Sequence, residues 1–123
     1  KLGNITMLAA NPSSKFSFQM TEEEKQECSA AIGRTFAAAT SFAVREGATL
    51  LVLDEVCAAI SCGFLPEGEV LAFLDGKPDD LEVVMTGRNP SEALQERADY
   101  ITEMVKRRHP FDKGIGARKG IEL

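Results

Sequence analysis

An apolar run that ends in two carboxylates is the feature that most constrains the fold of this chain. The run Leu50–Leu53 contains no polar residue, and Asp54 and Glu55 follow it directly. A short apolar run of this kind is typical of a strand buried in a parallel sheet. Ligands of α/β proteins bind beyond the carboxyl ends of such strands. The run therefore predicts acid groups at the ligand-binding edge of a parallel sheet.

Strand and helix patterns alternate over the 123 residues, a length that suits one domain. The alternation predicts an α/β fold, in which right-handed crossovers place helices on both faces of a parallel sheet. Strands are predicted at residues 5–10, 49–53, 81–85 and 99–104. Helices are predicted between residues 21 and 47, at 55–62 and 67–75, and from 90 onward.

The longest predicted helix has clear start and stop signals. Thr21 and Glu24 have the spacing of a capping box, in which each side chain bonds the backbone of the other residue. Gly47 is expected to end the helix in a left-handed conformation, and Asn89 is expected to cap the helix that starts at Pro90. A one-sided apolar stripe predicts that the long helix packs on a core, and it consists of Cys28, Ala31, Ile32, Phe36, Ala39, Phe42 and Ala43.

Three of the predicted strands end in charged or hydroxyl-bearing groups, which would meet at one edge of the sheet. Asp54 and Glu55 follow one strand, Thr86-Gly87-Arg88 follows the next, and a basic segment follows Met104. In P-loop nucleotide-binding proteins, acids after an apolar strand hold Mg²⁺ beside the phosphates. The glycine-rich loop GxxxxGK[ST], which cradles those phosphates, does not occur in this sequence. The sequence thus contains half of a nucleotide site.

Composition narrows the classes of function. The net charge of −5 argues against a general nucleic-acid binder. No apolar run reaches membrane-spanning length and no signal pattern opens the chain, so no membrane partner is expected. Cys28, Cys57 and Cys62 are odd in number and lack CxxC spacing, which disfavours a disulfide framework or a structural zinc site. Cys28 and Cys57 are expected to be core thiols, and a cytoplasmic location follows.

An ordered set of motifs runs from the apolar strand to the C-terminus. It consists of Leu53-Asp54-Glu55, Thr86-Gly87-Arg88, Thr102-Glu103-Met104, His109-Pro110-Phe111-Asp112, Gly114-Ile115 and Lys119-Gly120-Ile121-Glu122. In this order the set resembles the ATP:corrinoid adenosyltransferases of the P-loop type. The likeness is firm from about Leu50 onward and looser from Lys1 to Gly47. It implies a partial P-loop NTPase (RecA-like) fold.

The resemblance implies a transferase that moves the 5′-deoxyadenosyl group of ATP to the cobalt of a reduced corrinoid such as cob(I)alamin, releasing triphosphate. This reaction serves adenosylcobalamin synthesis or salvage. Because the reduced cobalt is itself the nucleophile, the protein needs no nucleophilic side chain. Its work is to orient the reacting carbon and to neutralise the leaving triphosphate. ATP and the corrinoid are then substrates, Mg²⁺ is the cofactor, and a reductase is a candidate partner.

The resemblance also assigns roles at the strand ends. Asp54 and Glu55 would hold Mg²⁺ on the phosphates. Thr86, Gly87 and Arg88 would contact the nucleotide, with Arg88 as a catalytic, positively charged partner of phosphate. On physical grounds alone, Glu55 could instead serve as the start of the following helix.

Two phenylalanines are assigned to the corrinoid. Phe18, and less directly Phe16, would lie in the loop that faces the corrin ring. An apolar ring below the cobalt would exclude a water or base ligand, which gives Phe18 a catalytic role by resemblance. The physical alternative is that both side chains are ordinary packing residues. His109, within the HPFD motif, is expected to shape a loop and not to carry protons.

The phosphate loop of the family lies upstream of the position that Lys1 occupies, and Lys1 is not Met. We therefore expect residues 1–123 to be a single α/β domain that corresponds to the C-terminal two-thirds of an adenosyltransferase domain. As it stands, such a chain is expected to be inactive. Its open sheet edge and exposed apolar loop favour a homodimer.

Two other functions are compatible with the residues. A non-catalytic relative without a nucleotide site would bind a corrinoid or a protein partner, and its corrinoid binding would be unaffected by ATP. A generic Mg-nucleotide hydrolase would release inorganic phosphate instead of triphosphate.

Overall fold

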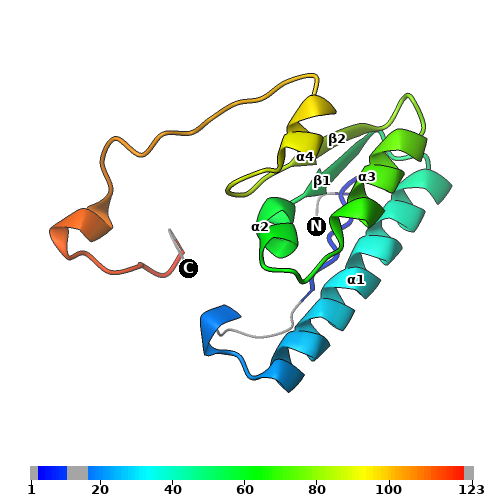
Figure 1. Cartoon of the computed structure of the whole chain (residues 1–123). Coiled ribbons are helices and arrows are strands. Elements are labelled where there is room, and N and C mark those ends of the chain that lie inside the picture. The colour runs from blue at the N-terminus through cyan, green and yellow to red at the C-terminus, as the bar shows by residue number, and fades with distance from the viewer. Residues whose placement is uncertain (1–2, 11–16, 121–123) are drawn as a thin grey trace.

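The computed structural model describes residues 3–10 and 17–120, and its elements alternate between residues 22 and 96 as predicted (Figure 1). The helices are α1 (Glu22–Arg45), α2 (Val56–Ser61), α3 (Glu67–Gly76) and α4 (Glu92–Glu96), and the strands are β1 (Leu50–Leu53) and β2 (Glu82–Met85). Short 3₁₀ helices, η1 and η2, cover Ser17–Gln19 and Pro110–Lys113. This part of the chain is a mixed α/β structure with a small parallel sheet.

The sheet consists of β1 and β2, which pair in parallel with Leu50 opposite Glu82 and Leu53 opposite Met85. The connection between them runs through α2 and α3, as a parallel pair requires. This register brings the carboxyl ends of both strands to the same edge. The predicted strands 49–53 and 81–85 are therefore confirmed.

Only one face of this sheet is packed on the core. Side chains alternate between the two faces of a strand, and the opposite face exposes Leu50, Val52 and Val84 by 54%, 53% and 44%. The prediction of helices on both faces is therefore wrong for the residues that the structure describes. The single crossover from β1 to β2 covers one side, which explains the result. The side chains on the packed face are Leu51, Leu53, Val83 and Met85.

Helix α1 begins at the predicted capping box. The Thr21 hydroxyl accepts a bond from the Glu24 N–H at 3.2 Å, and Glu24 Oε2 accepts one from the Thr21 N–H at 2.9 Å. The predicted one-sided stripe is confirmed in outline, and the buried residues of the helix are Cys28, Phe36, Thr40 and Ala43. Gly47, at φ 62°, adopts the predicted left-handed conformation after the helix.

The core lies between α1, the packed face of the sheet and the shorter helices. The rings of Phe36 and Phe73 meet edge to face, with centroids 6.1 Å apart, which joins α1 to α3. The Ser29 hydroxyl donates to the Phe64 carbonyl at 2.9 Å and ties the α2–α3 connection to α1. The buried members of the core cluster are Phe36, Leu53, Val56, Cys57, Leu65, Val70 and Leu94.

Two of the predicted strands, 5–10 and 99–104, are not strands in the structure. Ile5 and Met7 are 63% and 87% exposed, and Tyr100 and Met104 are each 94% exposed. The described sheet contains only β1 and β2, which pair with each other. A strand pattern indicates that a segment could join a sheet, but the hydrogen bonds of a sheet also require a neighbouring strand. Among the described residues, these two segments have no such neighbour.

Helix α4 is capped by Ser91 and not by Asn89, so the predicted cap is wrong. The Ser91 hydroxyl accepts a bond from the Leu94 N–H at 3.2 Å. The same hydroxyl also bonds the carboxylate of Glu67 at the start of α3. Asn89 instead adopts a left-handed conformation, at φ 53°, in the turn before the helix. Asn tolerates this conformation better than most residues, which explains its presence there.

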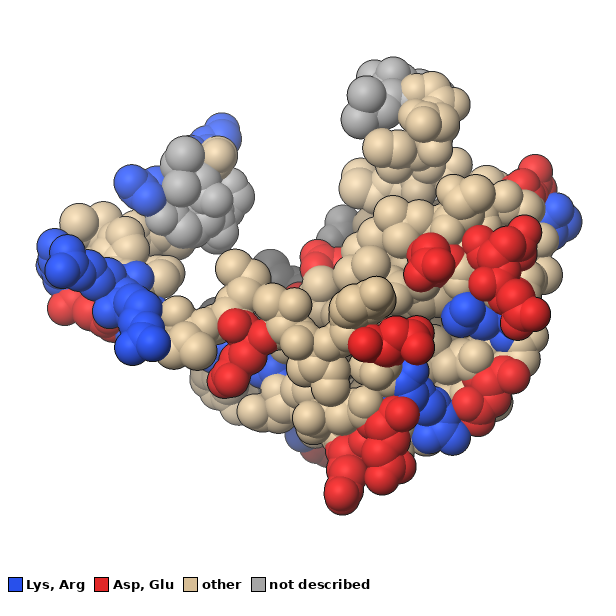
Figure 2. Space-filling view, turned by 90° about the horizontal axis from the view of Figure 1, so that it is seen from above, with Lys and Arg blue, Asp and Glu red and all other residues tan. Residues whose placement is uncertain are grey.

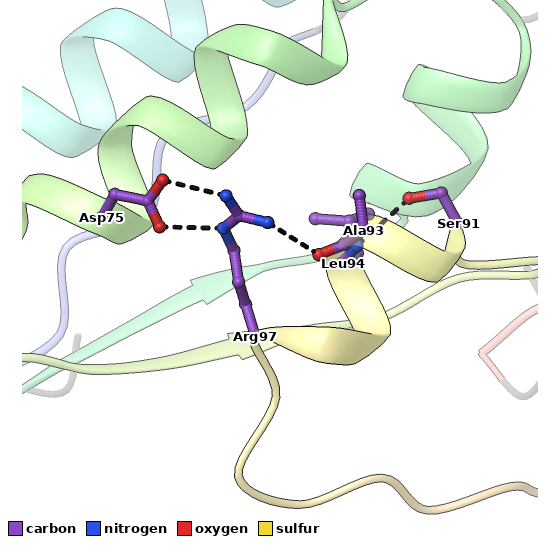
Figure 3. A network of polar contacts seen from close by, with 5 residues as sticks. All are labelled: Asp75, Ser91, Ala93, Leu94 and Arg97. Atoms are coloured by element: carbon purple, nitrogen blue, oxygen red, sulfur yellow. Dashed lines mark hydrogen bonds and ion pairs between the residues drawn. The ribbon is translucent and has the colours of Figure 1, made fainter.

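A bidentate ion pair joins the end of α4 to α3 (Figure 3). Nε and Nη2 of Arg97 donate to the two carboxylate oxygens of Asp75 at 2.8 and 3.0 Å. Nη1 of Arg97 donates to the Ala93 carbonyl at 3.1 Å. The hydrogen bonds from Arg97 hold the pKa of Asp75 below its usual range. Helix α4 is thus held on α3 at both ends.

The chain beyond α4 forms an extended arm, residues 101–120, that leads away from the helical body, residues 17–100 (Figure 1). The arm contains six basic residues (Lys and Arg) and two acidic residues (Asp and Glu), which gives it a net charge of +4. The body contains six basic and sixteen acidic residues, which gives it a net charge of −10. Figure 2 shows Lys and Arg gathered on the arm and Asp and Glu spread over the body. None of the helices in the described ranges has both the length and the apolar composition that crossing a membrane requires.

Candidate functional site

The predicted site residues meet where β1 and β2 end. Asp54 and Glu55 follow β1, and Thr86 follows β2. The parallel pairing continues one step beyond the strands, because the Thr86 N–H donates to the Leu53 carbonyl at 3.2 Å. The structure thus brings the acids and the Thr86-Gly87-Arg88 segment to one edge of the sheet, as the sequence predicts.

The Thr86 hydroxyl connects the two strand ends. It donates to Oδ1 of Asp54 at 2.6 Å and accepts a bond from the Glu55 N–H at 2.8 Å. The Thr86 carbonyl accepts a bond from the Cys57 N–H at 3.2 Å, which adds the first turn of α2 to the same network. Thr86 thus donates one of these hydrogen bonds and accepts two, and together they fix the turn between β1 and α2 against the end of β2.

Glu55 occupies the cap position of α2, but its side chain makes no capping hydrogen bond. The residue is left-handed, at φ 56° and ψ 21°, and it is exposed. A left-handed conformation is uncommon for a residue other than Gly, Asn or Asp, and such outliers concentrate at functional sites. The alternative that the Glu55 carboxylate serves as the helix cap is therefore not what the structure shows.

Gly87 brings the end of β2 into close contact with α2. Its φ of 132° lies in the region that favours glycine. A Cβ at this position would lie 2.8 Å from the Cys57 Cβ and 3.1 Å from the Ala58 nitrogen. Sequence reasoning did not identify this contact, and its only signal is a glycine directly after a strand. Burial raises the pKa of the Cys57 thiol, so Cys57 acts as a neutral packing group.

The donor set at this edge fits Mg²⁺. Asp54 and Glu55 are both exposed and offer hard carboxylate oxygens from adjacent residues. The described residues contain no cluster of three or more acid, His or Cys side chains suited to a metal. A protein-only cage is thus absent from this part of the chain, but Mg²⁺ is commonly held by one or two carboxylates together with substrate phosphates and water. Two carboxylates beside an open edge match that kind of site.

The remaining predicted site residues are Arg88, which follows the strand ends, and two phenylalanines, which precede α1 in the sequence. Arg88 is exposed and directly follows Gly87, so it lies next to the strand ends in the chain. Phe18 lies in η1, before α1, and is 81% exposed. Such exposure disfavours the alternative that Phe18 is a core packing residue. Phe16 lies outside the described residues.

The HPFD segment has a local structural role, as predicted for its histidine. Nδ1 of His109 accepts a bond from the Phe111 N–H at 3.1 Å and caps η2. Lys106 pairs with Asp112 at 2.8 Å across the same segment. These contacts order the middle of the arm.

Comparison with known proteins identifies the family. The profile described as ATP:corrinoid adenosyltransferase BtuR/CobO/CobP matches residues 1–123. A corrinoid adenosyltransferase of Sinorhizobium sp is 42% identical over 76 residues, which are 61% of this chain and 36% of that protein. The corrinoid adenosyltransferase of Pseudomonas aeruginosa is 42% identical over 74 residues, 60% of this chain and 36% of that protein.

A third relative, corrinoid adenosyltransferase CobA of Salmonella typhimurium, is 33% identical over 73 residues, 59% of this chain and 37% of that protein. The aligned part of the chain thus spans about a third of the length of these relatives. The family profile matches over the whole chain. The chain therefore belongs to the ATP:corrinoid adenosyltransferase family.

Proposed function

We propose that this chain supplies the Mg²⁺-binding edge of an enzyme that transfers the 5′-deoxyadenosyl group of ATP to the cobalt of a reduced corrinoid. The observation that carries the proposal is the joined pair of strand ends, where Asp54, Glu55 and Thr86 meet within hydrogen-bond distance. Membership of the family supports ATP and a corrinoid as the substrates at this edge. The parallel pairing of β1 and β2 supports a sheet of the P-loop kind.

In this proposal each side chain at the edge has a distinct task. Asp54 and Glu55 hold Mg²⁺, which would neutralise charge on the triphosphate as it leaves. Arg88 pairs with phosphate oxygens, because a guanidinium is always charged and matches their geometry. Gly87, which directly precedes Arg88, lets the backbone pass close to α2.

The corrinoid is assigned to the other end of the described chain. Phe18, which is 81% exposed, and Phe16 would present aromatic rings to the corrin. An apolar ring on the lower side of cobalt would favour loss of the lower ligand, which assists reduction to the nucleophilic state. A reductase would supply the electrons, and we place the reaction in the cytoplasm because Cys28 and Cys57 are buried free thiols.

We also propose that two copies associate. The positively charged arm and the negatively charged body have complementary charges. Tyr100 at the end of the body is 94% exposed, and Ile101 and Met104 at the start of the arm are 59% and 94% exposed. An arm that docks on the body of a second copy would cover these side chains and satisfy both charges.

One observation favours a second candidate function. The 123 residues contain no GxxxxGK[ST] loop, so we expect the isolated chain not to hold ATP as P-loop proteins do. A non-catalytic relative that binds a corrinoid without ATP would share this feature. It predicts corrinoid binding with an affinity that ATP does not change.

The experiment that tests the first proposal identifies the products. The complete reading frame that encodes this chain is expressed, and the protein is incubated with reduced corrinoid, ATP and Mg²⁺. The proposal predicts a cobalt–carbon bond and triphosphate in equal amounts. Inorganic phosphate without a corrinoid product would indicate the hydrolase, and corrinoid binding without either product would indicate the non-catalytic relative.

A further inference from the structure

The Thr86 hydroxyl has a more specific task than contact with the nucleotide. A threonine hydroxyl has one proton to donate, and here that proton is directed to Oδ1 of Asp54 at 2.6 Å. One of its lone pairs is taken by the Glu55 N–H at 2.8 Å. Donation to a phosphate would therefore require the bond to Asp54 to break. The geometry favours a group that holds the two acids over one that holds the ligand.

The two acids need such support because of the backbone between them. Glu55 is left-handed, a conformation that strains the backbone of a residue other than glycine unless the surroundings compensate. Its own N–H is the group that the Thr86 hydroxyl accepts from, so the bond acts directly on the strained residue. The support comes from Thr86, which directly follows β2 and is 31 residues away in the sequence. A local turn preference therefore does not account for it.

The arrangement also leaves carboxylate oxygens of Asp54 and Glu55 available to bind a cation. The Glu55 carboxylate is not used as the cap of α2, and Oδ2 of Asp54 takes no part in the bond from Thr86. A bond to Oδ1 limits rotation of the Asp54 carboxylate about its last side-chain torsion. Orientation of ligating carboxylates by outer hydrogen bonds is a general feature of metal sites.

We propose that Thr86 is a positioning residue, which fixes the conformation of Glu55 and the orientation of Asp54 so that the two carboxylates bind one divalent cation. The inference rests on the proposed function, because that function assigns the cation to these acids. It adds that the affinity for the cation depends on a hydroxyl at position 86. It also replaces the expectation that Thr86 contacts the nucleotide.

The test is a titration of the chain with Mn²⁺, a paramagnetic probe of Mg²⁺ sites, monitored by broadening of backbone amide signals in NMR spectra. The wild-type chain is expected to show selective broadening at Asp54 and Glu55. Thr86→Val removes the hydroxyl at nearly constant shape and should weaken Mn²⁺ binding by about tenfold or more. Thr86→Ser keeps the hydroxyl and should restore most of the affinity.

A matched control separates positioning from stability. Thr35→Val also removes a hydroxyl, one that donates to the Ala31 carbonyl within α1 at 2.9 Å, and it should leave Mn²⁺ affinity unchanged. Urea unfolding of each variant gives its stability independently of the metal. A purely structural Thr86 would lower the unfolding midpoint of Thr86→Val while its folded molecules bound Mn²⁺ as tightly as the wild type, and that result would overturn the inference.

The outcomes distinguish the inference from the proposed function. If the wild type binds Mn²⁺ at Asp54 and Glu55 and Thr86→Val binds it equally well, the proposed metal site stands and the positioning role is wrong. If Thr86→Ser fails to restore the affinity, the hydroxyl is not the cause and the inference is also wrong. If the wild type shows no selective broadening, the proposed metal site fails and the positioning role fails with it.

Discussion

Single residues with left-handed or glycine-like backbone decide how the two strand ends meet. Glu55 at φ 56° turns the chain from β1 into α2, and Gly87 at φ 132° lets the chain after β2 pass that helix. The bonds of Thr86 join these two turns. The sequence predicted which residues lie at the edge, because strand ends can be located from apolar runs. It did not predict that Thr86 would bind Asp54, since the side-chain geometry depends on register and on the left-handed Glu55.

Replacement of Gly87 tests this close packing. Gly87→Ala adds a Cβ 2.8 Å from the Cys57 Cβ at an unfavourable φ of 132°. We expect a loss of about 2–4 kcal/mol in the free energy of unfolding, from overpacking and backbone strain together.

The matched control is Gly33→Ala in α1, where nothing lies within 4 Å of the added Cβ. It should gain about 0.5–1 kcal/mol, because alanine favours helices more than glycine. Urea unfolding measures the free energy of unfolding of both variants. Equal changes for Gly87→Ala and Gly33→Ala would contradict close packing at Gly87.

The ion pair of Asp75 predicts a pH dependence of stability. Arg97 lowers the pKa of Asp75 in the folded chain from its ordinary 3.8. A depressed folded-state pKa contributes stability that is present above about pH 4 and is lost as the pH falls through the folded value. Arg97→Gln should therefore be less stable than the wild type at pH 7, with a difference that shrinks below pH 4.

Arg34→Gln is the control for that measurement. Arg34 is exposed and makes no ion pair with any residue that the structure describes. Its effect on the unfolding midpoint should be small and nearly constant from pH 7 to pH 3. A constant difference for Arg97→Gln over the same range would show that the pair with Asp75 does not contribute.

At the scale of elements, local signals predicted the helices better than the strands. The capping box at Thr21 and the glycine after α1 are read from a few adjacent residues, and both are confirmed. Residues 5–10 and 99–104 have strand patterns of the same quality as β1, yet neither pairs in the described sheet. Pairing depends on a neighbour that is distant in the sequence, so it cannot be inferred from the segment itself.

The start of α4 gives an element-scale prediction. Ser91→Ala removes the cap bond to the Leu94 N–H and the contact with Glu67, so the free energy of unfolding should fall by about 1–2 kcal/mol. Asn89→Gly should be neutral or slightly stabilising, because glycine accepts the φ of 53° at no steric cost. Thermal or urea unfolding compares the two. If Asn89→Gly lowered the free energy of unfolding more than Ser91→Ala did, Asn89 and not Ser91 would be the cap of α4.

At the scale of the whole molecule, charge is divided between the arm and the body. The arm carries a net charge of +4 and the body one of −10, and the large side chains at the start of the arm are exposed. The overall charge of −5 gives no sign of this division unless it is counted along the chain. The surface that such an arm would contact could not be predicted from the sequence, because an extended segment has no packing pattern of its own.

Association of two copies through the arm should depend on salt. Screening shortens the range of charge attraction from about 10 Å at 0.1 M salt to about 3 Å at 1 M. Sedimentation velocity should show dimers at low salt and monomers at high salt. Arg107→Glu with Arg108→Glu should abolish the dimer at low salt, whereas Lys25→Glu with Arg34→Glu, an equal change of charge on the body, should retain it. A dimer that is insensitive to both salt and the arm variant would place the interface elsewhere.

The most direct test of the central claim measures cobalt–carbon bond formation as a function of Mg²⁺. The complete reading frame that encodes this chain is assayed with ATP and reduced corrinoid, in parallel for the wild type and Glu55→Gln, and folding of both is verified by circular dichroism. We predict a Mg²⁺-dependent rate for the wild type and a rate at least about 100-fold lower for Glu55→Gln, since the negative charge of one ligand of the cation is lost. No product from the folded wild type would contradict adenosyl transfer by this protein, and equal rates for the two proteins would contradict a role of Glu55 in holding Mg²⁺.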